Sequence, residues 1–265
     1  MGRELLNSMP EWALIVLFTG GAALIGLGAV LASHRWLPRQ WTATESSDVV
    51  MGACGVVLTL FSVVLAFVIF DLYTGYASAE SNVNAEANSL RQIVQDAQAF
   101  PPPERQRLEQ AVSAYISEVS LHEFPALKDG GQDPKVETKL AQLSTALQSY
   151  SPENQAEIAF YRSAVDQVNQ LASERGSRVS IADTAVPSAF LVLLVILAIV
   201  GVGTACLIRM EHAAVDILLI TMISLVIGAG FVTALILQYP FSGSVAISPE
   251  ALVHGTLGEV VRHFH

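Results

Sequence analysis

The stretch VVMGACGVVLTLFSVVLAFVIF, residues Val49–Phe70, decides the fold class of this 265-residue chain. It holds no charged residue, and roughly 20 apolar residues in a helix are enough to cross the hydrocarbon core of a bilayer. A helix that is apolar on every side has no face to give to water, so a soluble domain cannot bury four of them. Three further stretches are apolar over a similar length, and the one charged residue within them is Asp216, at an edge: they are Trp12–Ala32, Pro187–Ile208 and Val215–Leu237.

The composition also indicates an integral membrane protein. Hydrophobic residues make up 52% of the chain and charged residues 14%, values outside the usual range of soluble domains. A net charge of −10 argues against nucleic acid as a partner, because nucleic-acid binding requires a basic surface. We expect the first stretch to be a retained span, since Arg3 is followed at once by Glu4 and the stretch is longer than the apolar core of a signal peptide.

The four apolar stretches are arranged two and two around a polar middle. Residues 1–70 hold the first two, 71–186 form the polar middle, 187–237 hold the last two, and 238–265 form a tail. We therefore predict an all-α membrane protein with four transmembrane helices and an extramembrane helical bundle inserted between the second and the third. The positively charged residues that flank the stretches are balanced between the two sides, so they do not set the orientation.

The polar middle carries apolar residues at alternating steps of four and three, the spacing by which helices pack side by side. Breaks at 101–103, at 130–134 and at Ser151–Glu153 divide it into four helices, with Ser151–Glu153 expected to start the fourth. Nothing interrupts 77–99 or 153–175, so we expect these outer helices to continue the second and third spans. The four seams are Val83, Ala87, Leu90, Val94, Ala97; Leu108, Val112, Tyr115, Val119; Val136, Leu140, Leu143, Leu147, Tyr150; and Ile158, Tyr161, Val165, Val168, Ala172.

The second span presents a stripe of small and weakly polar residues that is the candidate lining of a pore. At roughly 100° per residue the stripe falls within about 80° of the helix surface. Hydroxyls can replace part of an ion's hydration, and aromatic rings can gate a pore, but small residues also let helices pack closely, which is their commoner use. The stripe is Gly52, Gly55, Thr59, Ser62, Ala66, Phe70 and Tyr73, and it continues into Ala77, Glu80 and Asn84.

Several polar residues near the ends of the spans are candidate functional groups. The candidates for a pore mouth are Asp71, Glu80 and Asn84. For the two acids at the edges of spans, Asp71 and Asp216, the simpler expectation is that they are solvated. Alternatively, each pairs with a cation such as Arg178 or Arg209. A ring of acids at a mouth would favour cations.

Other side chains offer ordinary structural roles. His122 and Glu123 lack the second histidine of a zinc helix and are expected to form a surface pair. Cys54 and Cys206 lie in apolar stretches and are expected to pack as small residues. No catalytic, cofactor or metal motif occurs, and we predict no enzyme and no cofactor.

Three motifs resemble those of the bestrophin-like membrane proteins, and the resemblance covers nearly the whole chain after the first span. They are EANSL at Glu86–Leu90, LHEFPAL at Leu121–Leu127, and PFSG at Pro240–Gly243 followed by SPE at Ser248–Glu250. In the tail we expect a turn at Pro240–Gly243, an extended segment at 244–247 and a cap at Ser248–Glu250 for a short final helix. Phe124 departs from the family pattern, in which a tryptophan is expected. The paired phenylalanines of bestrophin pores and their acidic calcium-binding clusters are not found in the sequence.

The resemblance implies a function as well as a layout. Bestrophins are pentameric chloride channels with four spans and a helical domain on the cytosolic side. By that similarity we expect a homo-oligomer, a pentamer, in the cell (inner) membrane, with the bundle in the cytoplasm, the lipid bilayer around it and an anion as the permeant ion. The alternative is a membrane-anchored sensor or scaffold that does not conduct and whose bundle binds a partner or ligand.

Overall fold

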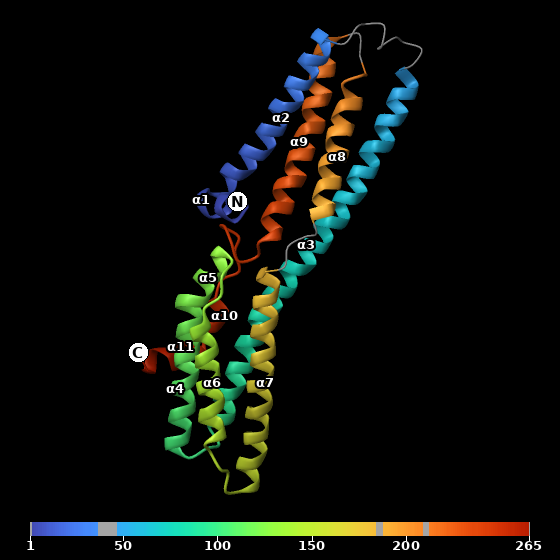
Figure 1. The fold of residues 1–265 in the computed structure, drawn as a ribbon. Coiled ribbons are helices and arrows are strands. Elements are labelled where there is room, and N and C mark those ends of the chain that lie inside the picture. The colour runs from blue at the N-terminus through green and yellow to red at the C-terminus, as the bar shows by residue number, and fades with distance from the viewer. Residues whose placement is uncertain (1, 37–46, 184–187, 209–211, 265) are drawn as a thin grey trace. The chain divides into compact units, whose positions relative to one another are not determined.

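The computed structural model describes residues 2–36, 47–183, 188–208 and 212–264, which Figure 1 shows as a ribbon. The chain divides into two compact units. The membrane unit combines Met1–Thr74 with Ala185–Gln238, and the bundle unit combines Gly75–Thr184 with Tyr239–His265. The tail therefore folds together with the polar middle of the chain.

Apolar helices make up the membrane unit. Helices α2 (Glu11–Trp36), α3 (Ser47–Ala97) and α9 (Ala213–Gln238) are long and apolar enough to cross a membrane. Helix α8 (Ser188–Ala205) is equally apolar but shorter as described, and a short helix α1 (Gly2–Ser8), which we did not expect, precedes α2. The chain is thus an all-helical membrane protein with three candidate spans among the described residues, where the sequence predicts four.

The length of α3 confirms that the second span continues into the polar middle as one helix, because its first part belongs to the membrane unit and its last part to the bundle unit. The corresponding expectation for the third span cannot be compared, because residues 184–187 lie outside the described residues.

Glycine lets α2 pack closely along α9 within the membrane unit. A Cβ atom on Gly228 would lie 2.7 Å from the carbonyl oxygen of Phe18 and 2.9 Å from the Cα atom of Thr19, both backbone atoms of α2. A Cβ atom on Gly26 would overlap the hydroxyl of Ser224 on α9. Small residues at such crossings allow backbones to approach, and this approach is a main source of helix association in lipid.

Replacing Gly228 with alanine should destabilise the membrane unit, because α2 must move away from α9 to admit the methyl group. We expect a cost of about 1–3 kcal/mol, the usual penalty for overpacking. Trp12 and Trp36 both lie on α2, so tryptophan fluorescence during thermal unfolding in detergent reports this change. Gly20→Ala is the matched control, since a Cβ atom there meets nothing within 4 Å. Equal midpoints for the two variants would contradict the close crossing.

Helices α3, α8 and α9 share the second contact region of the membrane unit. Phe61 and Val68 of α3 are buried in one apolar cluster with Leu194 and Leu197 of α8 and Ile227 of α9. Cys54 and Cys206 lie in a further buried cluster with Val30 and Ile220, and both are free thiols. The expectation that the cysteines pack as small apolar residues is therefore confirmed.

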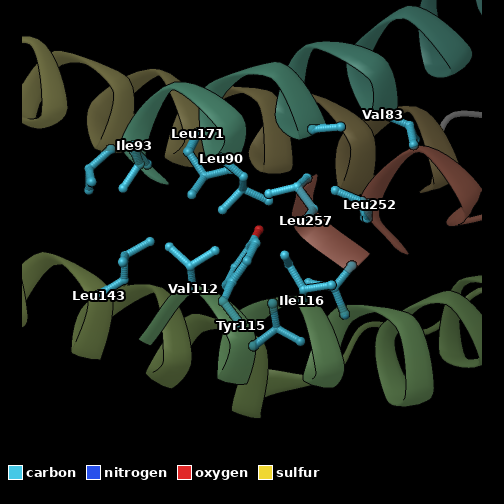
Figure 2. Close-up of a cluster of buried hydrophobic side chains, with 14 of the residues drawn as sticks. Val83, Leu90, Ile93, Val112, Tyr115, Ile116, Leu143, Leu171, Leu252 and Leu257 are labelled. Carbon is cyan, nitrogen blue, oxygen red and sulfur yellow. The ribbon is translucent and has the colours of Figure 1, made fainter. Parts of the chain in front are cut away.

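The bundle unit is built from the last part of α3 and the helices that follow it. Figure 2 shows side chains from several helices in its core, where Leu90, Tyr115 and Leu171 lie near one another and Leu252 and Leu257 of the tail join them. The remaining elements are α4 (Pro102–Glu118), a π-helical turn η3 (Val119–Glu123), α5 (Phe124–Asp129), α6 (Pro134–Gln148), α7 (Gln155–Asp183), α10 (Glu250–Val253) and α11 (Thr256–Phe264).

Local chemistry explains where these helices begin and end. Gly130 has φ of 83° and caps α5 in a left-handed conformation that favours glycine, and Asp133 then caps α6 by accepting a hydrogen bond from the backbone N–H of Lys135 at 2.9 Å. Helix α7 begins at Gln155, four residues after the predicted start at Ser151. The cap is at Asn154, whose side-chain oxygen accepts from the N–H of Glu157 at 2.9 Å, while the Glu157 carboxylate accepts from the Asn154 amide at 2.7 Å.

Three of the four predicted seams are confirmed. The first two seams, on α3 and on α4 with the first residue of η3, are buried throughout, and in α6 Val136, Leu143 and Leu147 are buried. The fourth seam is confirmed in part. Val168 is buried and Tyr161 and Val165 pack against the core, whereas Ala172 is exposed and α7 buries Ala164 and Leu171 instead. The tail also differs from expectation. Ser244 and Val245 lie in a turn and residues 246–248 have no regular structure, so the expected strand is absent from these residues. A helix does begin at Glu250 as expected, but α10 is short and a second helix, α11, follows it.

Candidate functional site

The predicted stripe lies on an exposed face of α3, where Ser62 and Ala66 border a groove shared with Met222 and Val226 of α9. Phe70 and Tyr73 have 68% and 59% of their surface exposed, although both adjoin an apolar span. On the opposite face of the same helix, Phe61, Val68 and Leu72 are buried. The smaller members of the stripe are exposed too, and these are Gly52, Gly55, Thr59, Ser62 and Ala66.

The exposed surface of this span has two flanks of different chemistry. One flank is the stripe, and the other carries large apolar side chains, among them Val56, Leu60 and Phe67, which are 70%, 51% and 71% exposed. Large apolar side chains are well solvated by lipid, whereas glycines and hydroxyls gain little from it. The hydroxyl of Ser62 donates to the carbonyl oxygen of Leu58 at 2.8 Å, so its own oxygen remains free to accept outward.

The three mouth candidates do not share one face. Glu80 and Asn84 are exposed on the part of α3 within the bundle unit, at angular positions that match the stripe. Asp71 is exposed as well. At about 100° per residue, however, it lies roughly 140° from the middle of the stripe. The helix period therefore groups Glu80 and Asn84 with the stripe and leaves Asp71 apart.

Asp216 is buried, so of the two alternatives expected for it the solvated one is wrong and the paired one remains. Its side chain is 3% exposed, and one carboxylate oxygen lies 3.5 Å from Nε2 of His34. Asp216 is in the first turn of α9 and His34 in the last turn of α2, positions where the helix dipoles favour an acid and a base respectively. Of the two cations named as partners, Arg178 is bound elsewhere and Arg209 lies outside the described residues.

A fully buried ion cluster lies in the bundle unit, and it is the main feature that the sequence did not predict. Arg178 of α7, Glu86 of α3 and Glu123 of η3 are all 0% exposed. The Arg178 guanidinium donates through Nε to Glu86 at 2.8 Å and through Nη2 to Glu123 at 2.7 Å. Arg175 donates to the other oxygen of Glu123 at 2.6 Å, and the Tyr115 hydroxyl donates to Glu86 at 2.6 Å.

Charges in this cluster balance, with two carboxylates against two guanidinium groups. Burial by itself lowers the pKa of Arg178, but the Glu86 and Glu123 carboxylates outweigh burial and raise that pKa. Burial, followed by the charge of Glu86, raises the pKa of the Tyr115 hydroxyl well above 10.0, so the hydroxyl stays protonated and remains a donor. The guanidinium carbon of Arg178 also lies 5.1 Å from the ring centroid of Phe124, a cation–π distance.

The π-helical turn η3 explains why Glu123 lies inside. His122 points outward and lies 3.2 Å from the Glu118 carboxylate, while the next residue, Glu123, is completely buried. The expected surface pair of His122 and Glu123 is therefore wrong for Glu123. The amphipathic pattern did not predict that Glu123 is buried, because a carboxylate is rarely buried unless it is paired. The partners of Glu123, Arg175 and Arg178, are more than fifty residues away in the sequence.

The three motifs quoted from the sequence meet at this cluster. Glu86 belongs to the first motif, and Glu123 and Phe124 belong to the second. Phe241 of the third motif packs edge-on against Phe124 with ring centroids 6.0 Å apart, and the Ser242 hydroxyl donates to the carbonyl oxygen of Lys128 at 2.7 Å. Among the described residues, no group of three or more metal-binding side chains is found.

A family model for the Bestrophin-like domain matches residues 20–252. The chain belongs to the Bestrophin-like family. Its fold is similar to solved structures of a bacterial bestrophin homolog from Klebsiella pneumoniae, determined as single-residue variants. One variant matches with a TM-score of 0.66 and 14% identity, and another with 0.65 and 14%, each over 94% of this chain and 97% of the other.

A further solved structure, described as that of a membrane protein, matches with a TM-score of 0.66 and 13% identity over 94% of this chain and 95% of the other. No curated protein matches the chain. At these identities the solved structures establish the shared fold, and the match to the family model establishes membership.

Proposed function

We propose that this Bestrophin-like chain is one subunit of a homo-oligomeric ion channel whose pore is lined by α3. The observation that carries the proposal is the exposed stripe from Gly52 to Tyr73, next to a separate flank of large apolar side chains. In one protomer, side chains such as Phe61 and Leu194 fill the space between α3, α8 and α9, so these described helices leave no water path between them.

Several copies around an axis supply what the single protomer lacks. Cyclic symmetry places the same face of every subunit at the axis. If the stripe of α3 is that face, glycines and the hydroxyls of Thr59 and Ser62 line a wet passage, while Val56, Leu60 and Phe67 lie towards neighbouring helices or lipid. Similarity to bestrophins favours a pentamer in which α8 is the fourth span. It also favours a place in the inner membrane, with the bundle on the cytoplasmic side.

Two candidate ions follow from different arguments. Chloride-like anions are favoured by the similarity to bestrophins. Cations are favoured by the stripe itself, because Glu80 places a carboxylate on this face and the Ser62 oxygen is free to accept. The reversal potential in a potassium chloride gradient distinguishes them. A cation-selective current would support the channel proposal but contradict anion selectivity.

Single-channel recording of the purified protein in planar bilayers tests the proposal, together with electron-microscopy class averages in detergent. We expect discrete conductance steps and particles with cyclic symmetry around a central axis. An inert protein that remains a monomer would overturn the proposal and favour the membrane-anchored sensor or scaffold.

Replacing Glu80 with lysine should shift selectivity towards anions, because each subunit then exchanges a negative charge on the stripe for a positive one. We expect the chloride-to-potassium permeability ratio to rise severalfold, read from the reversal potential in a potassium chloride gradient. Glu137→Lys is the matched control, since Glu137 is exposed on α6 and not on the stripe. Identical reversal potentials for both variants and the wild type would remove Glu80 from the ion path.

A further inference from the structure

The two cysteines of the chain lie close together in the membrane unit, one on α3 and one at the end of α8. Cys54 and Cys206 belong to one buried cluster with Val30 and Ile220, and they are 5% and 8% exposed. Both thiols are free, and they are near enough to interact electrostatically. The sequence holds no other cysteine, so any disulfide within the chain must join these two.

Helices α3 and α8 run antiparallel past one another. Residues 61–72 of α3 share an apolar cluster with residues 194–198 of α8. Nearer its first residue, α3 places Cys54 in a cluster with Ala205 and Cys206, at the end of α8. Falling residue numbers on α3 therefore match rising numbers on α8, and the two cysteines lie where α3 begins and α8 ends.

The same pairing of the helices places both cysteines at nearly the same depth. A Cβ atom on Gly201 of α8 would lie 2.9 Å from Cδ2 of Leu58 on α3, so the two helices approach closely at this level. Cys54 is four residues from Leu58 and Cys206 is five residues from Gly201, both towards the end where α3 begins. At about 1.5 Å per residue these steps are roughly 6 Å and 7.5 Å. A disulfide requires Cα atoms within about 7 Å of one another, and a shared depth on two closely packed helices favours that separation.

A small reagent can reach this pair from one side. Cys54 lines a hollow of about 220 Å³ together with Met51, Ala205 and Asp216. Buried thiols in apolar surroundings react slowly, so this hollow decides which reagents enter, and its volume favours compact ones over bulky ones. Cys206 does not line the hollow, and we therefore expect Cys54 to react first.

We propose that Cys54 and Cys206 are an oxidation site that forms a disulfide between α3 and α8, with a compact disulfide as the oxidant. The Cys54 thiolate attacks one sulfur of the oxidant, which releases one thiol and leaves Cys54 in a mixed disulfide. The Cys206 thiolate then attacks the Cys54 sulfur and releases the second thiol. The two cysteines lose two electrons and two protons, and the oxidant takes up both as it becomes two thiols.

The bridge ties the first turns of α3 to α8 and leaves the rest of α3 unlinked. If α3 lines the pore of a channel, the bridge restrains the pore-lining helix at the end that lies outside the bundle unit. With the bundle on the cytoplasmic side, this end faces the compartment outside the inner membrane, where disulfides form and persist. The effect on conduction rests on the proposed function, whereas the bridge itself does not.

Treatment of the purified protein with dithiodipyridine, a compact apolar disulfide, tests the pair. Mass spectrometry of peptides under non-reducing conditions should find Cys54 linked to Cys206 within one chain, with two thiopyridone molecules released for each chain. Cys206→Ala should instead keep the mixed disulfide on Cys54 and release one. Wild-type protein that stays unreacted, that carries a mixed disulfide on each cysteine, or that is linked only between chains would overturn the proposal.

Gly203 offers a matched control on the same helix. A Cβ atom there meets nothing within 4 Å, and Gly203 lines a groove whose described lining residues include none from α3. Gly203→Cys combined with Cys206→Ala keeps two cysteines in the chain, but its linked peptide should fall about tenfold or more below wild type because the geometry of a disulfide is specific. Equal linking in this variant would contradict a specific pair.

Planar-bilayer recordings separate the bridge from its effect on conduction. The open probability of the bridged protein should change severalfold and return on treatment with dithiothreitol, whereas Cys54→Ala treated in the same way should not change. A bridge that mass spectrometry detects but that leaves the current unaltered would overturn control of the pore by this pair. A protein that bridges but never conducts would support the oxidation site and contradict the proposed channel.

Discussion

Replacing Arg178 with methionine should strongly destabilise the bundle unit of the purified protein. The variant leaves Glu86 without its buried cation and leaves Glu123 with Arg175 alone, and both carboxylates are 0% exposed. Breaking a buried ion pair by removing one partner costs roughly 3–5 kcal/mol. Whole domains are stable by only about 5–15 kcal/mol, so the loss is a large part of the total and makes transient opening of the bundle far more frequent.

Hydrogen–deuterium exchange on peptides of α4 and α7 is the suitable measurement. Trp12 and Trp36 both lie in the membrane unit, so their fluorescence does not report on the bundle. Arg175→Met should cost less, because Arg175 is partly exposed and contacts Glu123 only, and Arg162→Met, an exposed cation on the same helix, should change nothing. Adding Glu86→Gln and Glu123→Gln to the Arg178 variant should restore part of the protection. Full protection in Arg178→Met alone would show that the cluster does not hold the bundle.

The sequence predicted the helices and most of their buried faces, because periodicity is a local property. Val83, Leu90 and Val112 were placed in the core by spacing alone, and all three are buried. The fourth seam was correct only in part, because beyond Val168 the inner face of α7 continues through Arg175 and Arg178, two cations that no apolar pattern counts. Steps of four and three from Val168 through Leu171 lead directly to both, so the signal was present as a charged extension of the seam.

The ion cluster itself could not be derived from spacing. Glu86 and Arg178 are 92 residues apart, and only the packed fold brings them within 2.8 Å. Glu86 stands beside the seam residues Val83 and Ala87, and a lone acid in that position is equally compatible with a solvated helix face. The motifs around Glu86, Glu123 and Phe241 marked the right segments, while the contact among them depends on long-range packing.

The stripe on α3 was visible in the sequence, but its use was open between a pore face and close helix packing. In the protomer, small residues that do serve packing have close neighbours, as Gly228 has on α2. Gly52 and Gly55 of the stripe have none, since a Cβ atom on either meets nothing within 4 Å. Packing among the described residues of the protomer therefore does not account for these two glycines, which are open to lipid, to water or to other copies.

Replacing Thr59 and Ser62 together with leucine should abolish most of the conductance without unfolding the protein. Both side chains are exposed in the protomer, so larger groups cause no clash within it. At the axis of an oligomer, each subunit would replace two hydroxyls with two isobutyl groups, and a ring of apolar groups closes a narrow pore by excluding water. We expect unitary conductance to fall by about tenfold or more, equivalent to a barrier of roughly 1.4 kcal/mol or more.

The same level of α3 offers a matched control on its other exposed flank. Val56→Leu with Val63→Leu adds apolar volume to side chains that are already 70% and 48% exposed, outside the stripe. This control should conduct like the wild type in planar bilayers, and the oligomer of both variants should elute unchanged on size exclusion. If the Thr59 and Ser62 variant conducts normally, α3 does not line the passage. If the control alone loses conductance, the opposite flank faces the axis, and the assignment of the two flanks must be exchanged.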